Sequence, residues 1–226
     1  MKNRQKELIK HLTSNYIKTA QPIASGFLVE KLRGAVSSAT VRNDMVELEK
    51  EGLIYQPHTS AGRIPTEKGF KFYIENFLKE KTLSEKQVSE IKKKKNLIAK
   101  DFRAGLKELA KYLAETSGEA IIVAFGNNDI YYTGLSNLFA KPEFEEKHLI
   151  CQLSSVLDQL DGAIHKIFDQ KICLKEVEIK IGADNIFSTS CSSLMIPYKK
   201  ALVTILGPMR MDYDNNLALL NNIKKL

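Results

Sequence analysis

The sequence lacks several features that would place it in a well-defined class of protein. It holds only three cysteines, Cys151, Cys173 and Cys191, which are widely separated and form no CxxC pair. This count argues against a disulfide framework and against a structural zinc site, and it favours a reducing compartment. The longest uninterrupted apolar run, residues 120–125, is far shorter than the roughly 18–20 residues of a membrane span. We therefore expect a cytoplasmic protein that does not enter a membrane.

Signatures of catalysis and of cofactor binding are also missing. The chain contains no P-loop and no GxGxxG motif, and no grouping of Cys, His and Asp indicates nucleophilic catalysis. The residues before position 8 are polar and contain no signal-peptide apolar core. Metal-ligand spacing is absent among the four histidines, which are His11, His58, His148 and His165. We expect no enzyme activity, no cofactor, no metal and no secretion.

Charge is what the sequence does have, and it is unevenly distributed. The 226 residues carry a formal net charge of +7, made up of +4 in residues 1–80, +5 in residues 81–116 and −2 in residues 117–226. A basic front half is typical of a protein that meets a polyanion, and charge alone leaves nucleic acid and acidic membrane both open. The lysine run 92–95 is interpreted as a solvated helix face, with contact to DNA flanks as the alternative.

Residues 1–80 show a pattern of helices followed by a hairpin. Helices are predicted over residues 3–13, 24–32, 38–51 and from Thr66 to about residue 80, with a tight turn at 33–36. Ser37 or Ser38 offers an N-cap to the third helix, and Gly52 ends it. Residues 53–57 and 64–65 predict two short strands joined by a Gly-containing loop. This order is the layout of a winged helix-turn-helix.

The third of these helices has a polar face that suits DNA. Val41, Met45 and Leu48 form its buried stripe, so that Ala39, Arg42, Asn43 and Val46 point away from the core. Arginine can grip guanine and asparagine can grip adenine in the major groove. Phosphate contacts are expected at the hydroxyl-bearing N-terminal end of this helix, from Ser37, Ser38 and Thr40. The hairpin loop is expected to add contacts from His58, Thr59, Ser60 and Arg63. We expect Arg63 at the hairpin tip, in the minor groove or on the backbone.

The remainder of the chain predicts one long helix and then a mixed domain. An apolar stripe from Val88 to Leu113 indicates a single helix over residues 85–116. That helix either pairs with a partner copy or packs on its own C-terminal domain. Strands are predicted over residues 120–125, 174–181, 193–198 and 201–206, and helices over 145–168 and 215–226. The fold class is therefore α+β.

The motifs in these regions closely resemble those of the heat-inducible transcription repressor HrcA family. The matching runs are residues 36–45 (VSSATVRNDM), 56–65 (QPHTSAGRIP), 134–139 (GLSNLF) with 142–144 (PEF), and 207–213 (GPMRMDY). The resemblance implies a homodimeric bacterial repressor, associated with the nucleoid, that binds the chaperone-operon inverted repeat called CIRCE and releases it on heat stress. It also implies the GroE chaperonin as a partner and a GAF-like C-terminal part.

The chain departs from the family pattern in its middle. A short stretch, 119–131, joins the long helix to the GLSNLF motif, where the family inserts strands and helices. We therefore expect the inserted dimerisation segment to be missing and the GAF-like fold to be short of strands. The predicted domains are a winged helix-turn-helix (1–80), a basic linking helix (81–117) and a GAF-like regulatory and dimerisation domain (118–226).

Two other interpretations remain open at this point. The first is a ligand-sensing winged-helix regulator, in which the C-terminal domain holds a metabolite. The second is an enzyme with an accessory DNA-binding arm, which predicts convergent acid, base or metal residues within 117–226. The 207–213 motif is interpreted as a structural strand-to-helix turn, in which Asp212 caps the last helix and Arg210 pairs with a carboxylate. A dimer or chaperonin contact is its alternative role.

Overall fold

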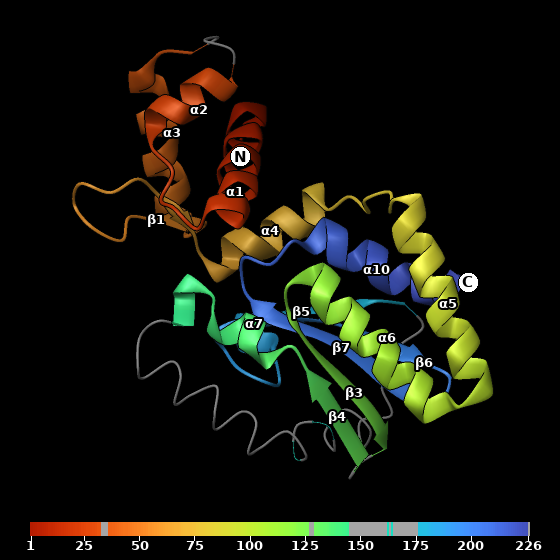
Figure 1. Cartoon of the computed structure of the whole chain (residues 1–226). Helices are drawn as coiled ribbons and strands as arrows, with labels where there is room; N and C mark the ends of the chain where they lie inside the picture. Colours follow the sequence, from red (N-terminus) through yellow and green to blue (C-terminus); the bar gives the residue numbers. More distant parts are fainter. Residues whose placement is uncertain (33–35, 127–128, 145–161, 163, 165–175, 226) are drawn as a thin grey trace. The chain divides into compact units, whose positions relative to one another are not determined.

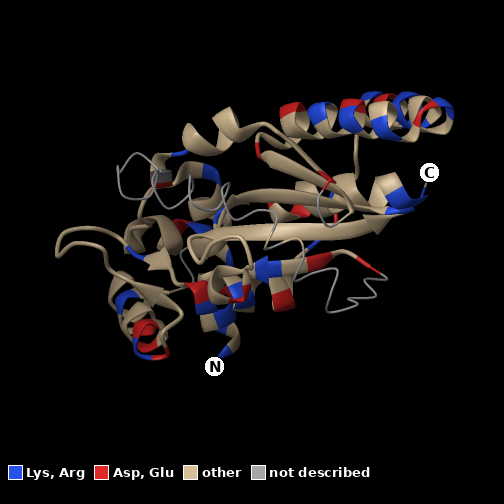
Figure 2. Cartoon of the chain, turned by 90° about the horizontal axis from the view of Figure 1, so that it is seen from below, with Lys and Arg blue, Asp and Glu red and all other residues tan. Residues whose placement is uncertain are grey.

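The computed structural model describes residues 1–32, 36–126, 129–144, 162, 164 and 176–225 (Figure 1). The chain divides into two compact units, residues 1–78 and 79–226, and each is described by itself. Within the described residues, no helix combines the length and the apolar character needed to cross a bilayer. Charged side chains lie mainly on the helices, whereas the long central strands carry almost none (Figure 2).

The N-terminal unit is a helical cluster with a small hairpin. Its elements are α1 (Asn3–Thr19), α2 (Ser25–Lys31), α3 (Ser38–Lys50), β1 (Ile54–Tyr55), β2 (Ile64–Pro65) and α4 (Glu67–Phe77). The first three helices bury a common apolar core that includes Leu8, Leu28 and Val41. β1 and β2 pair antiparallel, with Ile54 opposite Pro65. These elements confirm the predicted helices and the predicted hairpin.

Element boundaries differ from the prediction at both ends of this unit. α1 continues past the predicted end at residue 13 to Thr19, and Tyr16 in the added turn packs against Phe70 with ring centroids 6.2 Å apart. α4 stops at Phe77 rather than near residue 80, because Leu78 adopts an extended ψ of 129°. Gly52 closes the third helix with φ +72°, as predicted. The predicted tight turn falls mostly on residues 33–35, outside the described residues.

The C-terminal unit is built on a five-stranded antiparallel sheet. The strands are β3 (Ala120–Gly126), β4 (Asp129–Thr133), β5 (Glu178–Ile181), β6 (Cys191–Tyr198) and β7 (Ala201–Pro208), in the spatial order β4-β3-β7-β6-β5. Around the sheet lie α5 (Glu85–Lys100), α6 (Phe102–Ser117), α7 (Leu135–Phe139), α10 (Tyr213–Lys225) and two 3₁₀ turns, Pro142–Phe144 and Gly182–Asp184. β3, the first strand, pairs with β7, the last, so that Ile122 lies opposite Thr204 near the centre of the sheet.

The predicted single long helix over residues 85–116 is wrong. The chain instead forms α5 and α6, which pack against one another as a helical hairpin (Figure 1). The Asp101 carboxylate accepts the backbone N–H groups of Arg103 and Ala104 at 3.0 Å each, which starts a new helix. A Cβ on Gly105 would lie 2.3 Å from the backbone nitrogen of Ile98, so the close approach requires glycine.

The hairpin changes the interpretation of the apolar stripe. Ile91, Ile98, Leu106, Leu109 and Leu113 are all buried within this single chain. α6 packs on β3 and β4, and α5 packs on α10. The stripe is therefore satisfied within the C-terminal unit, and a continuous helix that pairs with a partner copy does not exist in the described part of this structure.

The strands agree with the prediction in outline, with one omission. β3, β6 and β7 confirm their predictions, and β5 begins at Glu178, within the predicted 174–181. β4 is absent from the prediction, because the sequence interpretation assigns most of that segment to a linker. The expectation that this fold is short of strands is therefore wrong for β4, which forms in the segment interpreted as a linker. The last helix begins at Tyr213, slightly before the prediction, and most of the helix predicted over 145–168 lies outside the described residues.

Candidate nucleic-acid interface

The N-terminal end of α3 is organised by Ser37. Its hydroxyl accepts the backbone N–H of Thr40 at 3.1 Å and lies 2.9 Å from the Thr40 hydroxyl. Ser37 is therefore the N-cap, and Ser38 and Ala39 are the first helical residues, both exposed. The positive end of a helix dipole and its unpaired amides favour an anion at this position.

The outward face of α3 has the predicted phase. Val41, Met45 and Leu48 are buried, whereas Arg42 and Asn43 are exposed. The same helix also buries a charged residue that the sequence analysis does not single out, because Asp44 is only 2% exposed. Arg4 from α1 binds it through two guanidinium nitrogens, with Nη2 to Oδ1 at 3.0 Å. This bidentate pair fixes α3 against α1 and so sets which side chains face outward.

The loop between β1 and β2 is held in shape by one side chain. The Gln56 amide donates to the carbonyl oxygens of Thr59 (2.8 Å) and Ala61 (2.9 Å). The backbone N–H of Ala61 also donates to the carbonyl of His58 at 2.9 Å. Thr59 and Ser60 are exposed at the tip, and His58 beside them is exposed as well. Gln56 is a positioning residue that sequence reasoning missed, although it belongs to the 56–65 motif.

Arg63 does not lie at the hairpin tip, where the sequence analysis predicts it. It directly precedes β2, and its backbone exchanges two hydrogen bonds of 2.9 Å with Ile23, which adds a bridge to the hairpin. Gly62 permits this pairing, because a Cβ there would lie 2.4 Å from the carbonyl carbon and oxygen of Ile23. The Arg63 guanidinium turns toward α3, and its side chain is only 17% exposed.

Glu49 connects the hairpin to α3. Its Oε2 accepts the Arg63 Nε–H at 3.0 Å, and its Oε1 accepts the backbone N–H of Gln56 at 3.2 Å. The sequence gives no reason to single out this carboxylate, since it lies in the C-terminal half of α3, away from the predicted contact with DNA. The structure gives Glu49 a definite task, which is to hold both ends of the hairpin loop against the helix.

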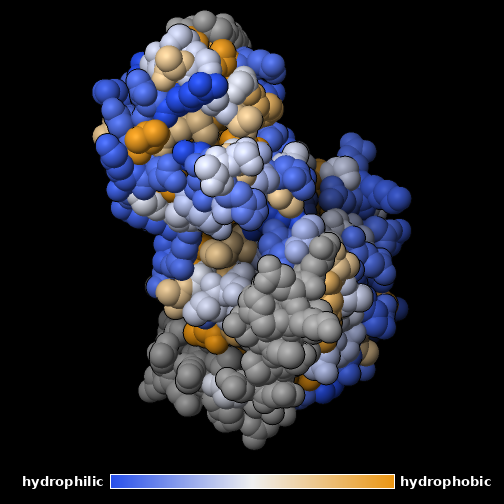
Figure 3. Space-filling view, turned by 90° about the vertical axis from the view of Figure 1, so that its left-hand side faces the viewer, coloured by the Kyte–Doolittle hydropathy of each residue, from blue (hydrophilic) through white to orange (hydrophobic). Residues whose placement is uncertain are grey.

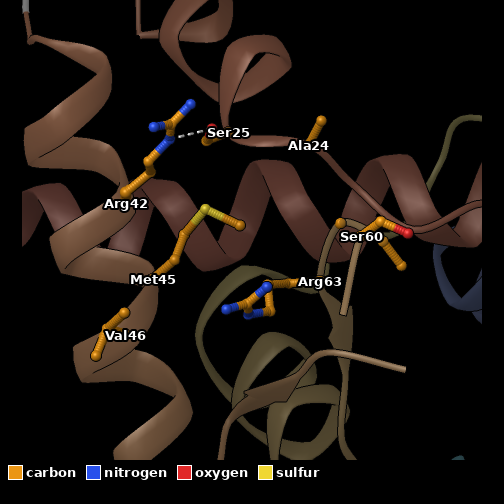
Figure 4. A pocket seen from close by; sticks show the side chains of 9 residues that line it. Ala24, Ser25, Arg42, Met45, Val46, Ser60 and Arg63 are labelled. Atoms are coloured by element: carbon orange, nitrogen blue, oxygen red, sulfur yellow. Dashed lines mark hydrogen bonds between the residues drawn. The ribbon is translucent and has the colours of Figure 1, made fainter. Parts of the chain in front are cut away.

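A groove of about 410 Å³ runs between α3, the start of α2 and the hairpin (Figure 4). Arg42 and Val46 line its α3 side, Ser25 lines the α2 side, and Ser60 and Arg63 line the hairpin side. The Arg42 Nε–H donates to the Ser25 hydroxyl at 3.4 Å, a long hydrogen bond that leaves the guanidinium accessible. The groove thus brings together two cationic side chains that come from different elements of the unit.

The C-terminal unit contains a buried carboxylate. Glu119, just before β3, is 3% exposed, and the Lys141 ammonium donates to its Oε1 at 3.0 Å. Gly207 provides the space, because a Cβ there would lie 2.4 Å from Oε2. Burial raises the pKa of Glu119 to about 7, and the nearby Lys141 opposes that rise. Oε2 has no hydrogen-bond partner within the described part of the chain.

The 207–213 motif surrounds this carboxylate with structural contacts. Arg210 binds Glu143 with both Nε and Nη2, the latter at 3.1 Å from Oε2. Asp212 accepts the backbone N–H of Asn215 at 3.1 Å and so caps α10. Tyr213 is buried, and its hydroxyl donates to the carbonyl of Met209 at 2.5 Å and lies 2.8 Å from the Ser192 hydroxyl. The predicted roles of Arg210 and Asp212 are therefore confirmed.

Metal-binding clusters of His, Cys, Asp and Glu do not occur among the described residues. Of the three cysteines, only Cys191 is described, and it is a buried thiol whose pKa burial raises to about 12. His148, His165, Cys151 and Cys173 lie outside the described residues.

Fold and site together define an α+β protein, with an N-terminal helical unit that presents a polar helix beside a hairpin and a C-terminal unit built on an antiparallel sheet. A family model described as "HrcA protein C terminal domain" matches residues 36–216. The chain therefore belongs to the HrcA family.

Curated relatives carry the same family name. A heat-inducible transcription repressor HrcA from Synechocystis sp. is 37% identical over 129 residues, which are 55% of this chain and 33% of the relative. Another from Chloroflexus aurantiacus is 49% identical over 81 residues, which are 36% of this chain and 22% of the relative. The matched region spans about a third of the relatives' length or less. The relatives are named as transcription repressors and not as enzymes.

A solved structure shares the whole fold. A crystal structure of a hypothetical protein superposes with a TM-score of 0.76 at 18% sequence identity, and the match covers 100% of this chain and 97% of that one. This likeness concerns the fold alone.

Proposed function

We propose that this chain is a sequence-specific DNA-binding repressor of heat-shock genes. In this proposal, residues 1–78 form a winged helix-turn-helix in which α2 and α3 are the two helices and the β1–β2 hairpin is the wing. The observation that carries the proposal is the exposed α3 face, with Arg42 and Asn43 presented beside the wing while the opposite face is locked to α1 by Arg4 and Asp44. An α-helix of this kind fits the major groove.

The side chains divide into those that read bases and those that position the protein. Arg42 and Asn43 would read guanine and adenine edges, with Ala39 against the same base pairs. Phosphate would be bound at the helix N-terminus and by the wing, through Ser37, Ser38, Thr40, His58, Thr59 and Ser60. Arg63 would act from the base of the wing, in the groove that it shares with Arg42.

The operator would be the inverted repeat called CIRCE, bound by a homodimer. A two-fold symmetric dimer places its two recognition helices in successive major grooves of a palindrome. The C-terminal unit would be a GAF-like domain for assembly and regulation, supported by the sheet order in which its first and last strands lie together. The GroE chaperonin would be a partner, and the protein would act in the cytoplasm at the nucleoid.

Heat would release the operator by unfolding or misassembly of a marginally stable repressor. Folding free energies of several kcal/mol collapse within a few degrees of the midpoint. Operator binding and circular dichroism measured together against temperature test this step. Binding that disappears while the fold remains intact would rule out the unfolding mechanism.

A gel shift at one stated salt concentration tests the central proposal. The probes are a duplex that contains the CIRCE inverted repeat and a duplex with the same bases scrambled, because unspecific phosphate binding depends steeply on salt. We expect clear preference for CIRCE in the wild type and loss of that preference in the Arg42→Ala/Asn43→Ala variant. The control is Lys200→Ala, which removes an exposed lysine between β6 and β7 of the C-terminal unit and should retain the preference. Equal binding of both duplexes by the wild type would end the proposal.

A further inference from the structure

The exposed face of α3, which carries Arg42 and Asn43, also contains an apolar residue that the proposed base contacts do not use. Val46 is 42% exposed, and it lies one helical turn after Arg42 on the same side of the helix. Other apolar side chains of α3, such as Val41 and Leu48, are completely buried. An exposed β-branched residue gains nothing from helix propensity, so neither folding nor solubility explains valine here.

Val46 lies at the edge of the groove rather than on an isolated patch of surface. It lines the groove with Met45 beside it, Arg42 on the N-terminal side and the guanidinium of Arg63 opposite (Figure 4). Arg63 is engaged by Glu49, and Arg42 by Ser25. In the space-filling view, apolar side chains occur as small patches in a mainly hydrophilic surface (Figure 3). The groove therefore offers a small apolar contact between two cations.

We infer that Val46 contacts the C5 methyl group of a thymine in the major groove, close to the base that Arg42 reads. This inference rests on the proposed DNA-binding function and adds a base to what α3 recognises. The thymine methyl is the only apolar group that a base edge presents in that groove, and apolar side chains recognise it by contact. The rise of 1.5 Å per residue places Val46 about 6 Å along the helix from Arg42, which is one to two base steps.

The flanking charges give the contact its orientation. The guanidinium groups of Arg42 and Arg63 attract phosphates and guanine oxygens of the DNA on either side of Val46. A thymine between those DNA groups presents its methyl to Val46, and the contact excludes water from the groove. Cytosine at that position lacks the methyl group, so it cannot make the apolar contact with Val46. Val46 would thereby discriminate thymine from cytosine as well as from uracil.

The test removes one methyl group at a time from the DNA. Each thymine of the CIRCE duplex is replaced singly by deoxyuridine, and the dissociation constant is measured for the wild type, Val46→Ala, Val46→Thr and the control Ile186→Ala. Ile186 is a similarly exposed apolar residue in the C-terminal unit. In the wild type, replacement of one thymine in each half-site should weaken binding about fourfold, because burial of one methyl group contributes about 0.8 kcal/mol.

The variants decide whether Val46 is responsible. Val46→Ala should bind the unmodified duplex about fourfold more weakly and become indifferent to deoxyuridine at that position. Val46→Thr keeps the shape and one methyl group of valine, so it should retain part of the loss of affinity that deoxyuridine causes. Ile186→Ala should retain all of that loss. Circular dichroism of each variant confirms the fold, and the scan of the wild type stands even if a variant does not fold.

The failures of the two proposals are distinguishable. The Val46 contact would be overturned if the protein prefers CIRCE but no thymine is sensitive to replacement by deoxyuridine. It would also be overturned if the loss of affinity at that thymine is unchanged in Val46→Ala. Both results leave the repressor function intact. Equal binding of CIRCE and scrambled duplex would overturn both. A penalty that disappears only in Val46→Ala would establish the contact.

Discussion

The two units of this protein use polar residues in opposite ways. In the N-terminal unit, most polar residues of α3 are exposed, and its buried carboxylate, Asp44, is completed by a bidentate arginine. In the C-terminal unit, Glu119 is buried with one oxygen paired to Lys141 and the other without a partner among the described residues. The first arrangement holds the exposed face of α3 in a fixed position. From the second, we expect stability to depend on pH.

The largest expected effect concerns the pH dependence of the C-terminal unit. The pKa of Glu119 is about 7 in the folded chain, raised from 4.5, so the folded chain binds more protons between these values. The stability that the protonated carboxyl supports is therefore complete below pH 4.5 and is lost as the pH rises through 7. Urea unfolding at pH 5 and pH 8, followed by circular dichroism, should differ by up to about 3 kcal/mol in the wild type.

Glu119→Gln should remove this difference. The control Glu178→Gln changes a half-buried glutamate of β5 that pairs with Lys180, and it should keep the difference. The glutamine cannot ionise, so no proton is released on unfolding between the two values of pH. Equal stability of the wild type at pH 5 and pH 8 would contradict the proposed state of the buried carboxyl group.

The next effect tests the α5–α6 hairpin. Gly105→Ala places a methyl group 2.3 Å from the Ile98 nitrogen, so the two helices must separate, and we expect a loss of about 2 kcal/mol in the free energy of unfolding. Gly26→Ala in α2 is the matched control, because the Cβ that alanine adds there has nothing within 4 Å apart from its chain neighbours and its own helix backbone, and alanine favours a helix. Urea unfolding that ranks Gly105→Ala at or above the wild type would contradict the tight turn.

Removal of the side chains with which α3 is proposed to read bases should cost a similar free energy, but in DNA binding rather than in folding. Arg42→Ala and Asn43→Ala are each expected to weaken operator binding by about 2 kcal/mol while random DNA changes little. Both side chains are exposed, so the melting temperature should stay near that of the wild type. Fluorescence anisotropy on CIRCE and scrambled duplexes measures the difference, and equal losses on both would exclude base reading.

The smallest effect distinguishes two roles for Arg63. If the Glu49–Arg63 pair holds the wing, Glu49→Gln and Arg63→Ala should each weaken binding to all duplexes by about 1 kcal/mol, and the double variant should lose little more. A free phosphate-binding cation predicts the reverse for Glu49→Gln, which would bind more tightly because a negative charge is gone. The slope of affinity against salt separates the two cases.

The phase of α3 is easier to predict from the sequence than the path of the hairpin. The positions of Val41, Met45 and Leu48 fix the phase of α3 by themselves, since a helix repeats every 3.6 residues. The place of Arg63 depends on backbone pairing with Ile23, which precedes α2 and α3 in the chain, and on Gly62 at the crossing. No local pattern contains that information, so the expected position at the tip was wrong.

The helical hairpin shows a different reason for failure. The apolar repeat of residues 88–113 is the same for one straight helix and for two that fold back, so periodicity cannot separate them. A usable signal was present, because Asp101 is an N-cap residue and Gly105 follows one turn later. Glu119 offered no such signal, since its environment is assembled from Lys141 and Gly207.

Methylation interference on the CIRCE duplex tests the central claim most directly. A methyl group on guanine N7 lies in the major groove and blocks a bidentate arginine there. The account predicts that such methylation within each half-site prevents binding of the wild type, and that interference at one guanine disappears in Arg42→Ala. Interference confined to adenine N3 in the minor groove, or an unchanged pattern in Arg42→Ala, would contradict major-groove reading by α3.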